Sequence, residues 1–312
     1  MSDGSIMMFW LVVAVLFLVY FIGVGYYFTQ QVLFMKTNSL EFIYQRELEN
    51  FRFDEGLYRS VQKQPFSIQS RYGYELKGYL FEAFDTNNWV IITHGVTVNK
   101  NNSIKYAELF LKLGFNVLTY DHRRHGESGG HTTSYGYYEK YDLQSVVQYL
   151  KDLKGEIVLG IHGESMGACT MLQYAGFVED SAAFYISDCA FSTFEEQLTY
   201  RLKMDYKLPK WAILPVSSIW LKLRNGFFIK DISPLLATHN IKNPVLFVHS
   251  KPDPYIPFTH TLKLFEAKNQ NKRELFIAEN GAHAMSLNEN KDDYYLIVSS
   301  FLNNIGLNHH SI

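Results

Sequence analysis

The pentapeptide Gly-Glu-Ser-Met-Gly at residues 163–167 is the part of this sequence whose residue types and spacing could most directly do chemistry. It follows the apolar run 157–161 and precedes a segment with a helical pattern. A serine at a sharp strand-to-helix turn exposes its hydroxyl above a parallel sheet, and the flanking glycines permit the strained backbone and the close chain approach. The pattern predicts that Ser165 is a nucleophile, although a G-x-S-x-G can also stand at an ordinary turn.

A serine hydroxyl is a weak nucleophile, so it needs a base and a third group that orients the base. Two further strand-like runs lead to such groups: run 245–248 leads to Asp253, and run 274–277 leads to His283. His283 could take the serine proton, and Asp253 could hold the imidazole in the required tautomer. The chain order Ser, acid, His differs from the orders of chymotrypsin-type and subtilisin-type enzymes.

Each of these assignments has a competitor in the sequence. Asp188 follows the strand-like run 183–187 and is the alternative acid. His260 also follows Asp253, but it falls in a helical pattern and not at a strand end. We therefore favour Ser165, Asp253 and His283.

Two more motifs accompany these residues. Residues 120–128, Tyr-Asp-His-Arg-Arg-His-Gly-Glu-Ser, are similar to a D-x-R-x-H-G-x-S turn, and residues 138–143 resemble an E-x-x-D-L helix start. From about Pro65 to about Leu302 the chain resembles the α/β-hydrolase superfamily. The resemblance is closest to its bacterial membrane-anchored, esterase-like branch, which is related to dienelactone hydrolases and prolyl oligopeptidase (S9-like) peptidase domains. This resemblance implies an α/β-hydrolase fold with a mostly parallel, doubly covered sheet.

The resemblance also implies an oxyanion hole. Its donors would be the backbone N–H groups of Met166, directly after the serine, and of Val96, which follows His94 and Gly95. Each such donor can lower the barrier by about 3 kcal/mol. We expect His94 and His162 to organise the neighbouring loops.

Charged residues in the turn that follows the strand-like run 115–120 have a structural interpretation. Asp121, Arg123 and Arg124 are expected to brace this turn through buried, charged hydrogen bonds. A catalytic role is not expected for them.

The elements that must position these residues can be placed from the apolar runs. Because strands and helices alternate, the sheet should be mostly parallel and covered on both faces. An antiparallel hairpin is predicted at its edge, since two strand-like runs flank a turn signal at 71–73. The predicted strands are 66–70, 74–83, 90–93, 115–120, 157–161, 183–187, 245–248 and 274–277, with helices near 103–113, 135–153 and 292–302.

An interval from about 191 to 240 interrupts the alternation. It is too long for a simple connection and is rich in large apolar residues, including Trp211, Trp220, Phe227 and Phe228. We interpret it as a cap over the active site; the alternative is a helical insertion that packs only against the sheet. An apolar cap would favour substrates with an acyl chain or an aromatic group.

Residues 6–28 are apolar or aromatic and carry no charge. At about 1.5 Å per residue they can cross a hydrocarbon layer of roughly 30 Å. We predict a transmembrane anchor at 1–29, a juxtamembrane connector at 30–64 and a hydrolase domain at 65–312. A cleaved signal peptide is the alternative, but residues 1–5 contain no Lys or Arg and no A-x-A-like site follows. Lys36 and Arg46 follow the helix, which favours a cytoplasmic catalytic domain.

Composition excludes several other classes. Lys and Arg number 29 against 31 Asp and Glu, which gives a net charge of -2 and no reason to expect nucleic acid as a partner. The two cysteines, Cys169 and Cys189, have no metal-ligand spacing and are predicted to be buried free thiols. No zinc-protease, dinucleotide or P-loop motif occurs, so we expect no metal and no cofactor.

Taken with the resemblance, these residues lead to a functional hypothesis. We expect a serine hydrolase that cleaves carboxylic esters through an acyl-enzyme intermediate, with a small-molecule ester as substrate. A serine peptidase of prolyl oligopeptidase type and a thioesterase are the enzymatic alternatives. A membrane-tethered binding module is the non-enzymatic one.

Overall fold

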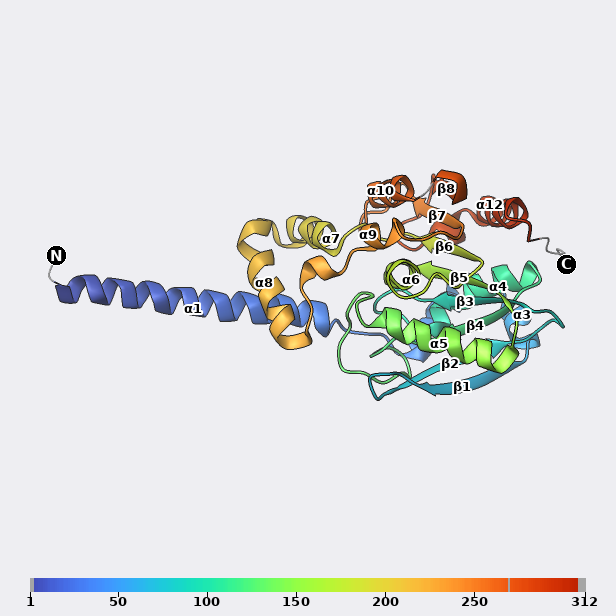
Figure 1. Cartoon of the computed structure of the whole chain (residues 1–312), viewed down its shortest axis with the longest axis horizontal. Coiled ribbons are helices and arrows are strands. Elements are labelled where there is room, and N and C mark those ends of the chain that lie inside the picture. The colour runs from blue at the N-terminus through green and yellow to red at the C-terminus, as the bar shows by residue number, and fades with distance from the viewer. Residues whose placement is uncertain (1–2, 269, 308–312) are drawn as a thin grey trace. The chain divides into compact units, whose positions relative to one another are not determined.

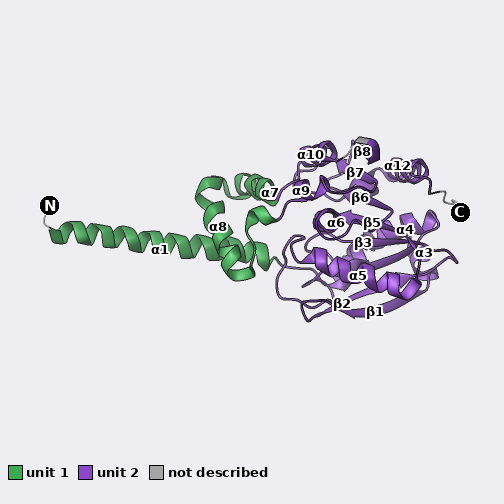
Figure 2. Ribbon diagram, in the orientation of Figure 1, with its two compact units in different colours: residues 1–35, 194–231 green, residues 36–193, 232–312 purple. Residues whose placement is uncertain are grey.

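The computed structural model describes residues 3–268 and 270–307. The chain forms two compact units, which Figure 2 colours separately. Unit 1 consists of residues 1–35 and 194–231, and unit 2 consists of residues 36–193 and 232–312.

Unit 2 is built on an eight-stranded sheet with the order β1-β2-β4-β3-β5-β6-β7-β8 (Figure 1). β1 pairs antiparallel with β2, and β2 antiparallel with β4, whereas the remaining pairs are parallel. The predicted edge hairpin and the mostly parallel sheet are thereby confirmed. The strands are β1 Lys63–Gln69, β2 Glu75–Phe81, β3 Asn88–Thr93, β4 Asn116–Tyr120, β5 Val158–Glu164, β6 Phe184–Asp188, β7 Val245–Ser250 and β8 Arg273–Ala278.

Helices cover both faces of this sheet. In Figure 1, α5 and α6 lie on the face toward the viewer. On one face the sheet residues pack with α4 and α12, and on the other Phe247 meets Phe265 of α10. The helices are α2 Leu40–Glu49, α3 Glu55–Ser60, η1 Lys100–Ser103, α4 Ile104–Lys112, α5 Glu139–Lys154, α6 Met166–Phe177, α9 Pro234–Thr238, α10 Thr259–Ala267, η4 Gln270–Lys272, α11 Ser286–Glu289 and α12 Lys291–Asn304.

The core explains why the central strands are continuous apolar runs in the sequence. Parallel strands with helices on both faces bury every side chain, so no polar alternation survives. β4 and β6 are buried along their whole length. The α4 and α12 face alone buries a cluster that includes Val90, Ile92, Phe110, Phe184, Ile186, Leu246, Val248 and Phe301.

The predicted connector at 30–64 is largely helical. Its part from Lys36 onward belongs to unit 2. The Ser39 hydroxyl accepts the N–H of Phe42 and thereby caps α2, and the Asp54 carboxylate accepts the N–H of Leu57 and caps α3.

Unit 1 combines the N-terminal helix with part of the predicted cap. Its elements are α1 Asp3–Leu33, α7 Phe194–Arg201, the π-helical turn η2 Leu202–Tyr206, α8 Lys210–Asn225 and η3 Ile229–Asp231. α1 is longer than the predicted anchor, and by length and composition it could cross a membrane. The remaining residues of the predicted cap, including α9, belong to unit 2.

α8 packs directly against α1. A Cβ on Gly25 would lie 1.9 Å from the Trp220 ring, so only a glycine permits this approach. The Arg224 guanidinium donates to the Thr29 hydroxyl at 2.7 Å and to the Gln30 side chain at 2.9 Å. These contacts join two segments that lie far apart in the sequence.

Candidate active site

Ser165 stands at the turn between β5 and α6, as the sequence predicts. Its backbone has φ 55° and ψ −116°, a conformation that a non-glycine residue rarely adopts. The turn is fixed by the Ser165 N–H, which donates to the Asp188 carbonyl at 2.8 Å. The serine side chain is thereby held at the carboxyl end of the sheet, where open α/β sheets bind their ligands.

Both glycines of the pentapeptide are required by close packing. A Cβ on Gly163 would lie 2.5 Å from the Ala168 backbone, and one on Gly167 would lie 2.1 Å from the Thr93 carbonyl oxygen. The spacing of these glycines therefore reflects how tightly α6 folds back over the ends of β3 and β5.

A chain of hydrogen bonds connects the three favoured residues. Ser165 Oγ lies 2.8 Å from His283 Nε2, and His283 Nδ1 lies 2.7 Å from Asp253 Oδ2. A carboxylate can only accept, so Nδ1 carries the proton and Nε2 is left to accept from the serine hydroxyl. This is the arrangement in which histidine can act as a general base toward serine.

Asp253 is held by more donors than His283 alone. Its Oδ1 accepts the backbone N–H groups of Tyr255 and Ile256 at 2.8 and 3.0 Å. Its Oδ2 also lies 3.0 Å from Nε2 of His249, a buried residue on β7. Burial raises the pKa of Asp253, but the hydrogen bonds from His249 and His283 outweigh it and hold the pKa below its ordinary value.

His249 has a role that the sequence reasoning missed. Its Nε2 faces two acceptors, the Asp253 carboxylate and the Ile256 carbonyl at 2.8 Å, so this nitrogen must carry a proton. Its Nδ1 lies 2.7 Å from the Thr261 hydroxyl. The signal in the sequence is its position on the strand that leads to Asp253, but no spacing rule distinguishes it from an ordinary buried histidine.

The loop that carries His283 is tightly constrained. Gly281 has φ 107°, and a Cβ there would lie 2.9 Å from both the Met285 carbonyl oxygen and the Ser250 hydroxyl. The Tyr255 ring lies beside the imidazole, with 5.0 Å between the ring centroids. The imidazole is therefore positioned by its loop as well as by Asp253.

The N–H groups expected to form an oxyanion hole are available. Met166 is the first residue of α6, so its N–H has no acceptor inside the helix. In residues 3–268 and 270–307, neither this N–H nor that of Val96 donates to another group of the chain. A Cβ on Gly95 would lie 3.4 Å from the Ser165 Cβ, which places the Val96 loop against the serine.

His94 orients this loop. Its Nε2 accepts the His122 N–H at 2.9 Å, so Nδ1 carries the proton and donates to the Gly95 carbonyl at 2.7 Å. The peptide bond is trans, so a fixed Gly95 carbonyl also fixes the opposite direction of the Val96 N–H. Burial, together with His122 and His125, holds the pKa of His94 well below its usual value and keeps the ring neutral.

Asp188, the alternative acid, lies in a different environment. It is fully buried, its carboxylate accepts the hydroxyls of Tyr294 and Ser286, each at 3.1 Å, and it also lies 3.1 Å from the Tyr106 hydroxyl, whose one proton it shares with Glu164. Burial, and then the nearby Glu164, raises the pKa of Asp188. Its side chain makes no hydrogen bond with His283, so the structure brings Asp253 and not Asp188 to the histidine.

Glu164, which precedes the serine, anchors the same buried network. It forms an ion pair with Lys105 at 2.7 Å and accepts from Asn102 and Tyr106 at 2.8 and 2.9 Å. Tyr106 thus bridges Glu164 and Asp188. The network ties the ends of β5 and β6 to α4 beneath the serine turn.

The turn after β4 is braced in part as expected. Asp121 forms a buried ion pair with Lys100 at 2.6 Å and accepts the Glu127 N–H at 3.0 Å. Arg123 instead packs its guanidinium over the rings of Tyr74 and Tyr138. The sequence predicted a brace of charged hydrogen bonds but identified neither Lys100 nor this aromatic packing.

His260 and the two cysteines are not part of the hydrogen-bonded series from Ser165 to Asp253. His260 is on α10 and lies 2.8 Å from the Ser192 hydroxyl. Cys169 and Cys189 are free and buried, as predicted. In the described part of the chain, no group of three or more His, Cys, Asp or Glu residues could hold a metal ion.

Comparison with known proteins shows the family to which the chain belongs. A profile described as alpha/beta hydrolase fold matches residues 88–214. The protein YqkD of Bacillus subtilis (strain 168), itself described as uncharacterized, is 50% identical over 286 residues, which cover 91% of this chain and 93% of YqkD. The chain belongs to the α/β-hydrolase family.

More distant relatives of this α/β hydrolase include proteins with a stated activity. The lysophosphatidylserine lipase ABHD12 of Mus musculus is 26% identical over 195 residues, covering 59% of this chain and 46% of the lipase. Among solved structures, esterase Pf2001 of Pyrococcus furiosus has a TM-score of 0.66 at 23% identity, covering 80% of this chain and 94% of the esterase. Acylaminoacyl peptidase of Pyrococcus horikoshii has a TM-score of 0.60 at 18% identity, covering 81% of this chain and 43% of the peptidase. At these identities the structural likeness shows the fold alone.

Proposed function

We propose that this α/β hydrolase is a serine esterase that cleaves carboxylic esters through an acyl-enzyme. Ser165 attacks the ester carbonyl, His283 takes the serine proton and then gives it to the leaving alcohol, and Asp253 stabilises the imidazolium. The N–H groups of Val96 and Met166 hold the oxyanion. Water then hydrolyses the acyl-enzyme by the same route.

The observation that carries this proposal is the hydrogen-bonded series from Ser165 through His283 to Asp253. Its two distances, 2.8 and 2.7 Å, lie within the range for proton transfer. The lowered pKa of Asp253 keeps the carboxylate ionised, as this role requires. A membrane-tethered binding module would have no need for this arrangement.

An ester with an acyl chain is the substrate class that we favour. The relatives' names support it, since they include a lysophosphatidylserine lipase and an esterase. The proposed membrane anchor, α1, supports it as well, because an anchored enzyme meets substrates that partition into a bilayer. By the positive-inside rule we place unit 2 on the cytoplasmic side.

A fluorophosphonate probe tests the mechanism directly. Full-length protein in detergent should label at Ser165, and Ser165→Ala should remove the label. Cys169→Ala, which alters a buried residue on the same helix, is the control that should keep it. Labelling that persists in Ser165→Ala would move the nucleophile elsewhere.

Substrate class is tested with a series of p-nitrophenyl esters, acyl thioesters and proline-containing peptide amides. We expect medium-chain esters to exceed acetate by about tenfold in kcat/KM, a difference that a few buried methylenes can supply. Cleavage of the peptides but not the esters would instead identify a peptidase. Preference for thioesters would identify a thioesterase.

A further inference from the structure

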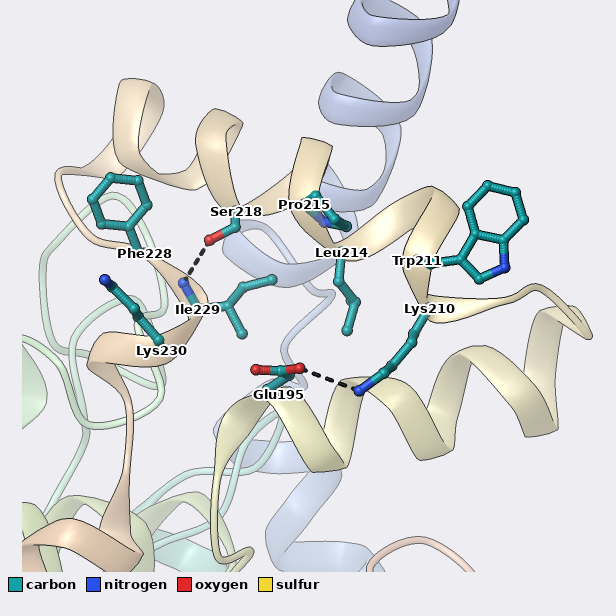
Figure 3. Close-up of a pocket in the computed structure, with 9 residues that line it drawn as sticks. All are labelled: Glu195, Lys210, Trp211, Leu214, Pro215, Ser218, Phe228, Ile229 and Lys230. Atoms are coloured by element: carbon teal, nitrogen blue, oxygen red, sulfur yellow. Dashed lines mark hydrogen bonds and ion pairs between the residues drawn. The ribbon is translucent and has the colours of Figure 1, made fainter.

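Unit 1 contains a pocket that the proposed hydrolysis does not use. It has a volume of about 320 Å³, at the lower end of the range for small-molecule sites. Figure 3 shows it between α8, η3 and the start of α7. Ser218 on α8 accepts the N–H of Ile229 at 3.1 Å and so holds η3 against α8. The apolar walls of the pocket are formed by Trp211, Leu214, Pro215, Phe228 and Ile229.

The polar groups of the pocket favour an anion. Lys210 and Lys230 both line it, and Glu195 contacts Lys210 at a long 3.4 Å. In the sequence, residues 194–231 carry seven Lys and Arg against four Asp and Glu. An apolar pocket with lysines matches a molecule that has a hydrocarbon chain and a negative headgroup.

One face of α8 is apolar and exposed. Trp211, Pro215, Ile219 and Leu223 recur every fourth residue and therefore form a stripe along the helix. Trp211 is 78% exposed and Leu223 is 71% exposed. The opposite face, with Ile213, Leu214 and Leu221, is buried.

The contacts of α8 with α1 indicate the level of α1 at which α8 packs. The Tyr20 hydroxyl donates to the Ala212 carbonyl, and the Phe21 ring lies 5.9 Å from Trp220. Both α1 residues lie within the uncharged segment 6–28, with Tyr20 about 12 Å from its end at 1.5 Å per residue. At this level of a membrane-spanning segment the start of α8 lies among the acyl chains of one leaflet, whereas Arg224, which contacts Thr29 and Gln30 just beyond the segment, lies at the headgroups.

We propose that α8 lies within one leaflet of the bilayer and that the pocket binds the acyl chain of an anionic membrane lipid, whose headgroup contacts Lys210 and Lys230. The stripe from Trp211 to Leu223 faces the surrounding lipid. This inference rests on the proposed membrane anchoring by α1. It does not depend on the hydrolytic mechanism.

Photo-crosslinking in vesicles tests the proposal. Full-length protein with Ser165→Ala, which prevents turnover, is reconstituted in phosphatidylcholine that contains a phosphatidylglycerol or a phosphatidylcholine with a diazirine in the acyl chain. Peptide mapping should find adducts on Leu214 and Ile229, which line the pocket and are not part of the stripe, with the phosphatidylglycerol probe favoured by about fivefold per contacting lysine. Equal labelling by the two probes, or adducts confined to α1, would overturn the proposal.

Two sets of variants make the result specific. Lys210→Gln with Lys230→Gln should abolish the preference for the anionic probe, whereas Lys242→Gln with Lys272→Gln on unit 2 should preserve it. Leu214→Trp, which fills the pocket, should remove the adducts on Ile229; since it could also disturb folding, the lysine pair provides the independent measurement. Failure of the protein to enter vesicles would contradict the anchor, and the same probes in detergent micelles would then still test the pocket.

Discussion

The ends of β6 and β7 present the same residue type to the same edge of the sheet, yet the two carboxylates have different hydrogen-bond partners. Asp188 is surrounded by hydroxyls and has a raised pKa, whereas Asp253 is surrounded by histidines and backbone N–H groups and has a lowered pKa. Hydroxyl groups can hydrogen-bond to a neutral carboxylic acid at Asp188. The N–H donors around Asp253 instead require an ionised carboxylate. Position after a strand therefore identifies candidates, and the donors around each carboxylate decide between them.

The largest effect should come from Asp253→Asn. The asparagine cannot accept the Nδ1 proton of His283 as the carboxylate does, so the imidazole loses its required tautomer. We expect kcat to fall by about 10⁴-fold, measured as p-nitrophenyl ester hydrolysis in detergent. An unchanged thermal midpoint is the control for folding. A loss under tenfold would mean that another group orients His283.

His249→Leu should have the next largest effect. It removes one donor to Asp253, and a hydrogen bond to a charged group contributes about 1.5–3 kcal/mol, so kcat should fall by about tenfold to a hundredfold. His249→Gln, which keeps an amide donor, should recover part of the rate. Equal losses in both variants would indicate a packing role and not a hydrogen-bonding one.

Asp188→Asn should affect stability more than rate. Its amide nitrogen would face hydroxyls that now donate to the carboxylate, at a cost of about 1–3 kcal/mol in the free energy of unfolding. We expect kcat to stay within about tenfold of wild type, with the loss appearing in denaturant titrations. A larger loss of kcat than that of Asp253→Asn would make Asp188 the catalytic acid.

The smallest expected effect is a pH dependence of the stability lost in Asp188→Asn. Because the pKa of Asp188 is raised in the folded state, this state binds more protons than the unfolded one above the unfolded pKa of about 3.9. In the wild type, the contribution of Asp188 to the free energy of unfolding therefore declines as the pH rises from about 4 through the raised pKa. The cost of Asp188→Asn should accordingly be smaller at pH 7 than at pH 4. A cost that grows with pH would contradict the raised pKa.

The sequence was sufficient to predict much of the fold of unit 2. Apolar runs predicted the parallel strands because both of their faces are buried, and the residues that follow the runs predicted the positions of Ser165, Asp253 and His283. The partners of these residues could not be predicted. Lys100 and Lys105 reach Asp121 and Glu164 through packing of separate elements, whereas His249 reaches Asp253 only through the turn that follows β7, and nothing in their local sequence records the charge that they face.

Unit 1 was predicted only in outline. The long N-terminal helix was predicted from residues 6–28, and the interval 191–240 from its length and aromatic content. Their association depends on a shape match, the Gly25 notch against Trp220, and on polar contacts such as Arg224 with Thr29. A single glycine in an apolar helix carries no such information before its partner is known.

The pairing of α1 with α8 has a consequence for biosynthesis. Tyr20 and Ala212 are 192 positions apart, so at 5–20 residues per second α1 leaves the ribosome roughly 10–40 s before α8 is made. During this interval the Thr29 hydroxyl is not left unpaired, because it donates to the Gly25 carbonyl of its own helix at 2.6 Å. Once Arg224 has been made, the oxygen of that hydroxyl can still accept a hydrogen bond from its guanidinium. α1 can therefore form early and gain its packing partner late, and a nascent chain halted before Lys210 would leave α1 without that partner.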